Sequence, residues 1–132
     1  MNIAVFGATG GTGREVVKQA LAQGHRVTAF VRDPARLSMQ DERLRVVVGD
    51  VLDAEPVYRA VEGQDGVVVA LGSRDRSNRS VRSEGTANVI DAMQAHAVPR
   101  LVVVSAGGVG DSYQQVPFLI KILIRTVLRN TY

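Results

Sequence analysis

Cysteine is absent from all 132 residues of this chain, which excludes disulfide bonds and thiol chemistry and is typical of a reducing compartment. No apolar run approaches the roughly 20 residues that a membrane-spanning helix needs. No basic segment precedes the first apolar run, so we expect no signal peptide. These absences together predict a cytoplasmic protein without a membrane partner.

Aromatic residues make up only 5% of the sequence, and 16 basic against 13 acidic residues leave a net charge of only +3. Proteins that bind nucleic acids concentrate basic charge on one face and carry a recognisable motif or stacking aromatic residues. We find no such motif and expect no nucleic-acid partner. The arginines cluster once, and this cluster is either a solvated loop or a phosphate contact: Arg74, Arg76, Arg79 and Arg82.

Histidine is also scarce, with His25 and His96 as the only two. Neither has an acidic or histidine neighbour at a spacing typical of metal ligands, so we predict no metal site. His96 lies near the end of a predicted helix with Pro99 after it, where histidine commonly satisfies terminal carbonyl groups. Both histidines are therefore interpreted as structural.

Glycine, in contrast, is concentrated near the N-terminus. Residues 2–6 form a short apolar run typical of a buried strand, and Gly7, Gly10 and Gly13 follow it at three-residue spacing. A helical pattern begins directly afterwards, over residues 12–23. A glycine-rich turn between a strand and a helix N-terminus exposes unpaired N–H groups and favours an anion such as a pyrophosphate. A plain connecting turn is the alternative.

The remaining chain alternates apolar strands with helices. Strands are predicted at residues 26–31, 44–48, 66–71 and 100–104, and helices at 54–62 and 81–96. Gly24 and Gly63 are expected to end helices. Near-continuous apolar strands indicate burial on both faces, as in a parallel sheet. We predict one domain over residues 1–132, a Rossmann-like doubly wound α/β fold with strand order 3-2-1-4-5.

The segment after the second predicted strand bears on the choice of nucleotide. In such folds an acidic residue here binds a ribose 2′-hydroxyl, whereas an arginine accommodates a 2′-phosphate. Asp33 is either that acid or, because Pro34 follows it, the N-cap of a short helical turn. Arg32 and Arg36 flank it, and guanidinium groups suit bidentate phosphate contacts. The sequence therefore favours NADP(H), with NAD(H) as the alternative.

Two further residues follow predicted strands at the edge where these sheets bind ligands. Asp50 is a candidate to accept a hydrogen bond from an adenine amino group, with Val51 packing on the ring. Asp50 or Asp53 is equally a candidate to begin the next helix. Ser105 either lies beside the reacting groups of a substrate or begins a turn.

The last segment, 116–130, is strongly apolar apart from a basic stripe at Lys121, Arg125 and Arg129. If helical, it must bury most of its circumference. Packing against protein outside this chain, with a homo-oligomer as one form, is favoured over attachment to a membrane surface.

Several motifs occur together in one order. They are GATGGTG at 7–13, VRD at 31–33, GDV at 49–51, LGS at 71–73 and SEGTANVIDAM at 83–93. In this order and spacing the chain resembles atypical short-chain dehydrogenase/reductases over residues 1–108. The likeness is strongest to the biliverdin reductase B/flavin reductase group, with NmrA-like redox sensors nearby.

The resemblance implies roles for individual positions. A pyrophosphate loop is implied at Gly7, Thr9, Gly10, Gly11, Thr12 and Gly13. Arg32 and Arg36 are implied to bind the 2′-phosphate, and Asp50 and Val51 to contact the adenine. Leu71 and Gly72 line the nicotinamide side, and Ser105 matches a serine near the site of hydride transfer.

The chain departs from the wider family in two respects. Typical members carry a Tyr-x-x-x-Lys pair for proton transfer, whereas here Tyr58 is followed four residues later by Glu62, and Tyr113 by Pro117. Family members also continue further, so we expect a domain truncated in its substrate-binding part.

These features predict an NADPH-dependent reductase that passes hydride to a flat small-molecule acceptor such as a flavin, quinone or tetrapyrrole. A non-catalytic NADP(H) sensor and an inert fragment are the alternatives.

Overall fold

A computed structural model describes residues 1–71 and 79–104, with the side chains of 79–82 left aside. Five strands form one sheet in the order β3-β2-β1-β4-β5, and every neighbouring pair is parallel. The strands are β1 (Asn2–Phe6), β2 (Arg26–Val31), β3 (Leu44–Val48), β4 (Gly66–Val69) and β5 (Leu101–Val103). This confirms the predicted doubly wound sheet and its strand order. Gly72, the arginines at 74 and 76, Ser105 and the segment 116–130 lie outside the described residues.

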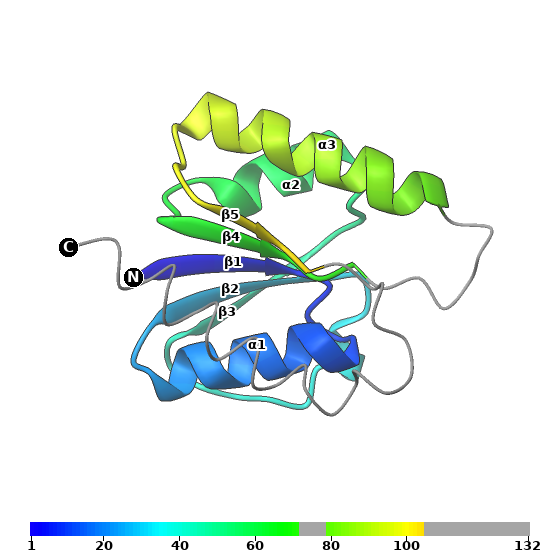
Figure 1. The fold of residues 1–132 in the computed structure, drawn as a ribbon. Helices are drawn as coiled ribbons and strands as arrows, with labels where there is room; N and C mark the ends of the chain where they lie inside the picture. The colour runs from blue at the N-terminus through cyan, green and yellow to red at the C-terminus, as the bar shows by residue number, and fades with distance from the viewer. Residues whose placement is uncertain (72–78, 105–132) are drawn as a thin grey trace.

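Helices cover both faces of the sheet (Figure 1). Helix α1 (Gly11–Ala22) lies on one face, and α2 (Ala54–Val61) and α3 (Arg79–His96) lie on the other. A short 3-10 helix, η1 (Pro34–Arg36), follows β2. Helix α1 ends as predicted, because Gly24 adopts a φ of +90°. Its N–H bonds the Leu21 carbonyl at 3.0 Å, and the next N–H bonds that of Ala20 at 3.1 Å, which satisfies two terminal carbonyl groups.

The core consists of two apolar layers, one on each face of the sheet. Successive residues of a strand point to opposite faces, so Val5 packs under α1 whereas Phe6 packs under α2 and α3. The Phe6 and Phe30 rings stack with centroids 4.9 Å apart. Burial on both faces explains why the central strands are apolar throughout.

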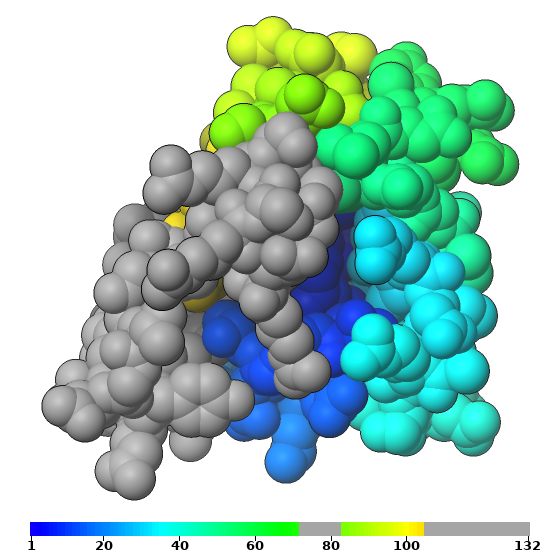
Figure 2. All heavy atoms as spheres, turned by 90° about the vertical axis from the view of Figure 1, so that its right-hand side faces the viewer, coloured from blue at the N-terminus to red at the C-terminus, as the bar shows by residue number. Residues whose placement is uncertain are grey.

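The strand register brings one row of residues into line across the sheet. This row consists of Val47, Phe30, Phe6, Val69 and Val103. The segments that follow the strands therefore leave the sheet at one common edge, its carboxyl edge. Figure 2 looks onto this edge, where blue N-terminal residues lie recessed between the cyan and green segments that follow β2 and β3.

Candidate functional site

The glycine-rich segment forms a tight turn between β1 and α1. Gly7 adopts a φ of +86°, and the N–H of Gly10 donates to its carbonyl at 3.2 Å. Gly10 occupies the N-cap position of α1, so no side chain caps the N–H groups of the first turn. These N–H groups have no intrahelical partner, and the helix dipole adds a partial positive charge. The turn therefore has the geometry that the predicted anion contact requires.

Gly7 and Gly13 keep this turn closely packed. A Cβ atom on Gly13 would lie 1.9 Å from the carbonyl oxygen of Gly7, and one on Gly7 would lie 2.4 Å from that of Ala70. Both neighbours are main chain, so neither can turn aside as a side chain could. At Gly10, by contrast, the nearest atom to an added Cβ is 3.5 Å away. Two glycines thus hold the turn against the sheet, and Gly10 leaves its outer side open.

In the segment after β2, Asp33 caps the short helix η1, which is one of the two roles that the sequence predicts for it. Its carboxylate accepts a hydrogen bond of 3.0 Å from the N–H of Ala35, and Pro34 occupies the first position of η1. Arg32 and Arg36 are both exposed on either side of this cap. The segment therefore offers two guanidinium groups, while one carboxylate oxygen is already engaged.

Arg14 links this segment to the glycine-rich turn, which the sequence analysis did not anticipate. One nitrogen of its guanidinium lies 3.4 Å from the Thr9 carbonyl and 3.4 Å from the Arg36 carbonyl. Both distances are at the long end for hydrogen bonds. Its position in the first turn of α1 was the available signal, since a helix that begins at the turn must direct some first-turn side chains toward it.

The segment after β3 is folded tightly around Asp50. One carboxylate oxygen of Asp50 accepts from the N–H of Leu52 at 2.9 Å, and the Asp50 carbonyl accepts from the N–H of Asp53 at 2.9 Å. Asp53 takes the N-cap position of α2, but its side chain makes no capping bond. The Asp50 carboxylate is therefore held in one orientation at the carboxyl edge, which suits the adenine contact predicted for it.

Val51 and Leu71 lie deeper than a purely ligand-facing role requires. The Val51 side chain is only 5% exposed and belongs to the apolar layer under α2 and α3. Leu71 is partly buried against the same layer. Most of the Val51 surface thus contacts protein, which leaves little of it for packing on an adenine ring.

The two histidines make structural contacts, in line with their sequence-based interpretation. His96 Nε2 lies 3.0 Å from the Tyr58 carbonyl, and the two rings contact each other at a tilt of 48° with centroids 4.0 Å apart. The N-terminal amine lies 3.3 Å from His25 Nδ1. Burial, followed by the positive charges of the N-terminus and Arg43, lowers the pKa of His25.

Among residues 1–71 and 79–104, no group of three or more metal-ligating side chains gathers to hold an ion. No helix in the same part of the chain is both long and apolar enough to cross a membrane.

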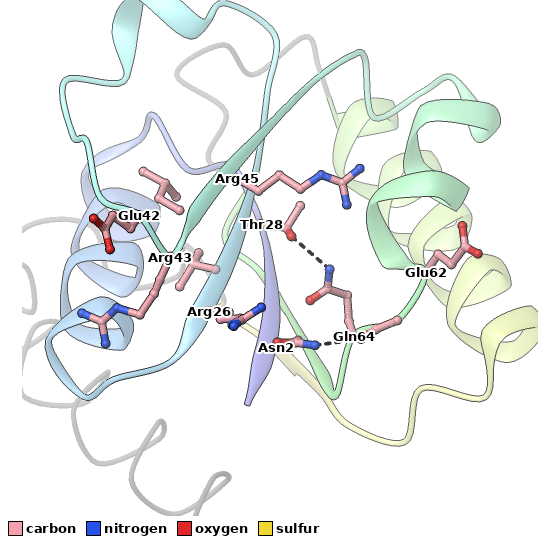
Figure 3. Close-up of a pocket in the computed structure, with 11 residues that line it drawn as sticks. Asn2, Arg26, Thr28, Glu42, Arg43, Arg45, Glu62 and Gln64 are labelled. Carbon is pink, nitrogen blue, oxygen red and sulfur yellow. Dashed lines mark hydrogen bonds between the residues drawn. The ribbon is translucent and has the colours of Figure 1, made fainter.

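A hollow of about 540 Å³ lies at the opposite edge of the sheet, where the strands begin (Figure 3). Arg26, Arg45 and Glu62 contribute to its lining. Gln64 donates to the Thr28 hydroxyl at 3.0 Å, while its own buried carbonyl oxygen has no partner among the described residues. Both charge signs line this open hollow, and the residues predicted to bind a cofactor lie at the other edge.

Comparison with known proteins bears directly on the glycine-rich turn and the loops around it. Residues 7–131 match a family of proteins described as NAD(P)H-binding. The chain belongs to this NAD(P)H-binding family.

Individual relatives are similar to most of this chain. A 3-diazoavenalumate denitrifying reductase from a Streptomyces species is 38% identical over 117 aligned residues, and the match covers 80% of this chain and 38% of that protein. The photosystem II assembly factor Ycf39 of a Synechocystis species is 31% identical over 123 residues, 90% of this chain and 37% of that protein. The chain thus spans less than two-fifths of the length of these relatives.

A solved structure shows the same architecture. A Rossmann-fold NAD(P)-binding family protein from Shigella flexneri superposes with a TM-score of 0.69 at 30% identity, over 93% of this chain and 59% of that one. The described residues fit the nicotinamide dinucleotide that this family binds, because an uncapped helix N-terminus, two exposed arginines and an oriented carboxylate meet at one edge. The turn would take the pyrophosphate and Asp50 the adenine.

Proposed function

We propose that this member of the NAD(P)H-binding family prefers NADP(H), and that the whole protein is a cytoplasmic NADPH-dependent reductase of the biliverdin reductase B/flavin reductase-like group. The observation that carries the preference is the segment after β2. There Asp33 caps η1, while Arg32 and Arg36 stand exposed at the carboxyl edge. A 2′-phosphate finds two guanidinium partners there, whereas a ribose hydroxyl finds a carboxylate with one oxygen already bonded.

When bound, the reduced nicotinamide would supply the chemistry, the transfer to the acceptor of a hydride, which is equivalent to two electrons and one proton. The residues of this chain hold and orient the dinucleotide, and the acceptor takes its remaining proton from solvent. Ser105, outside the described residues, is our candidate for a hydrogen bond beside the nicotinamide. A flat acceptor such as a flavin, quinone or tetrapyrrole suits a site without a Tyr-x-x-x-Lys pair.

A titration of the full chain with NADPH and NADH tests the preference. Arg32→Ala should weaken NADPH binding about tenfold or more, because a hydrogen bond to a charged group is worth about 1.5–3 kcal/mol, and should leave NADH binding nearly unchanged. Arg26→Ala is the matched control, since Arg26 begins the same strand at the opposite edge. Tighter binding of NADH than of NADPH by the unmodified chain would overturn the preference.

A non-catalytic NADP(H) sensor of the NmrA-like type is the second candidate. It draws on the similarity to Ycf39, whose name describes an assembly factor. Partner affinities that differ between NADP⁺ and NADPH, without turnover of any flat acceptor by the complete protein, would favour the sensor. We also propose self-association through the segment 116–130, which sedimentation of the chain with and without that segment would test.

A further inference from the structure

Helix α3 approaches the carboxyl edge unusually closely at Gly85. A Cβ atom on this glycine would lie 2.8 and 2.9 Å from the two methyl groups of Val51, and 3.3 Å from a methyl group of Leu71. Glycine inside a helix is about 1 kcal/mol less favourable than alanine. The close approach explains the glycine, because alanine would push the helix away from both residues.

Asn88 stands one turn further along the same helix and bonds the same loop. Its side-chain amide donates to the Val51 carbonyl at 3.0 Å. Asparagine is also a poor residue for a helix interior, because its side chain competes for backbone hydrogen bonds. Two residues that weaken α3 as a helix therefore both contact Val51.

The position of Val51 determines the position of Asp50. The loop that contains them is tied to the sheet at its start, where the N–H of Gly49 donates to the Val31 carbonyl at 2.9 Å. Beyond that point the Asp50 carboxylate closes a local turn onto the N–H of Leu52. Local turns do not fix a loop relative to the rest of the fold, whereas a bond from α3 does. By bonding the Val51 carbonyl, Asn88 thus fixes the position of the neighbouring Asp50 carboxylate relative to the rest of the fold.

Gly85 lies against a second loop of the site as well as against the loop that Asn88 bonds. It faces Val51, which follows β3, and Leu71, which follows β4. The first loop lies on the adenine side and the second on the nicotinamide side of the proposed cofactor. One helix residue thereby sets the spacing between the two loops.

We propose that Gly85 and Asn88 are positioning residues of the cofactor site. Neither needs to touch the dinucleotide: Asn88 holds the loop of Asp50 and Val51 in place, and Gly85 keeps that loop and Leu71 at a fixed separation. This inference rests on the proposed cofactor binding. Its test includes a measurement on the free protein, so that the positioning role and the proposed cofactor binding can be refuted separately.

His96 provides a matched control on the same helix. Its ring nitrogen also bonds a backbone carbonyl across elements, that of Tyr58 at 3.0 Å, but at the end of α3 remote from the carboxyl edge. Asn88→Ala and His96→Ala each remove one such bond and each place alanine, a strong helix former, in α3. A general loss of stability should affect both variants alike, whereas a loss of positioning should affect only the first.

The first measurement is amide hydrogen exchange at Leu52 and Asp53 in the free protein. Asn88→Ala should speed exchange at these amides about fivefold or more, and His96→Ala should leave them within about twofold of the parent chain. The second is the affinity for adenosine 2′,5′-bisphosphate, which represents the adenosine half of NADPH. Asn88→Ala should weaken it about three- to tenfold. Asn88→Ser is the fallback if the alanine variant does not fold.

Gly85→Ala tests the spacing of the two loops. It should weaken binding of whole NADPH more than binding of adenosine 2′,5′-bisphosphate, because only NADPH spans both loops. Equal behaviour of the Asn88 and His96 variants in exchange and affinity would overturn the positioning role and leave the proposed function intact. Absence of nucleotide binding in the parent chain would refute the proposed function, and the exchange rates would still decide whether Asn88 holds the loop.

Discussion

The glycine-rich turn combines close packing against α1 with an open side for an anion. Substitution of Gly13 by alanine tests the first of these two roles. The added Cβ would lie 1.9 Å from the Gly7 carbonyl oxygen and 2.7 Å from its carbon. Carbon atoms in favourable contact are about 3.5–4.0 Å apart, so main chain must move. Overpacking of this kind costs about 1–3 kcal/mol, and a rigid carbonyl group places it at the upper end. The better helix propensity of alanine offsets about 1 kcal/mol of this cost, so the free energy of unfolding should fall by about 2 kcal/mol.

Gly10→Ala is the comparison within the same turn. Its Cβ would meet no atom closer than 3.5 Å, and its φ of −74° suits any residue. We expect it to lower the stability by no more than about 1 kcal/mol, the penalty for a poor N-cap residue. Its methyl group would, however, stand on the open side of the turn and keep a pyrophosphate from the backbone. NADPH binding should therefore fall about tenfold or more in this nearly native protein.

Thermal unfolding and NADPH titration of both variants measure the two effects. For a chain of this size, 2 kcal/mol corresponds to about 8 °C, so Gly13→Ala should melt well below the parent and Gly10→Ala within about 4 °C of it. Equal or higher stability of Gly13→Ala would refute the reasoning, because α1 would then not depend on close contact with Gly7. Full NADPH affinity in Gly10→Ala would show that the anion does not approach this face of the turn.

Two more predictions concern His25, which precedes β2 at the edge of the sheet opposite the candidate site, and Asp33, which follows β2. Because burial and nearby positive charge lower the pKa of His25 from its ordinary 6.5, neutral His25 stabilises the fold above pH 6.5, and this stabilisation is lost as the pH falls from 6.5 through the folded-state pKa. In urea titrations the stability difference between the parent and His25→Gln should shrink from pH 7.5 to 5.5, and a constant difference would contradict the assignment. Asp33→Asn should keep both the cap and the NADPH preference, whereas Asp33→Ala should lose about 1 kcal/mol of local stability. A loss of NADH binding in both Asp33 variants would instead identify Asp33 as a ribose ligand.

The fold was largely predictable because its signals are local. Strands buried on both faces are continuously apolar, so β1, β2 and β3 were predicted at their observed bounds. The ends of β4 and β5 were predicted one or two residues too long, since Ala70 and Val104 are apolar and their N–H groups still bond the Phe6 and Val69 carbonyls just past the strand ends. The Asp-Pro pair at 33–34 likewise predicted an N-cap from two adjacent residues, and Asp33 makes the capping bond.

Contacts between distant segments were not predictable in the same way. Asn88 and Val51 are 37 residues apart, and nothing in either local sequence indicates that they form a hydrogen bond. The Arg14 contact with the Arg36 carbonyl likewise depends on how η1 folds back toward α1. The hollow at the amino edge arises from strand beginnings that are separate in sequence. Residues on the loops at the carboxyl edge were thus easier to single out from the sequence than the residues of other elements that contact those loops.

The glycines show why this difference arises. Gly24 and Gly63 have positive φ angles and follow helices, so position in the sequence was enough to interpret them. Gly13 and Gly85 lie inside helices, where each lowers helix propensity by about 1 kcal/mol, and only the atoms that an added Cβ would meet reveal the reason. In both cases a helix comes into contact with a segment of the site, the glycine-rich turn for Gly13 and the loops after β3 and β4 for Gly85. A glycine inside a helix that borders a site therefore indicates that the helix positions a segment of that site. The segment that the glycine contacts then predicts which part of the ligand would be affected by its substitution.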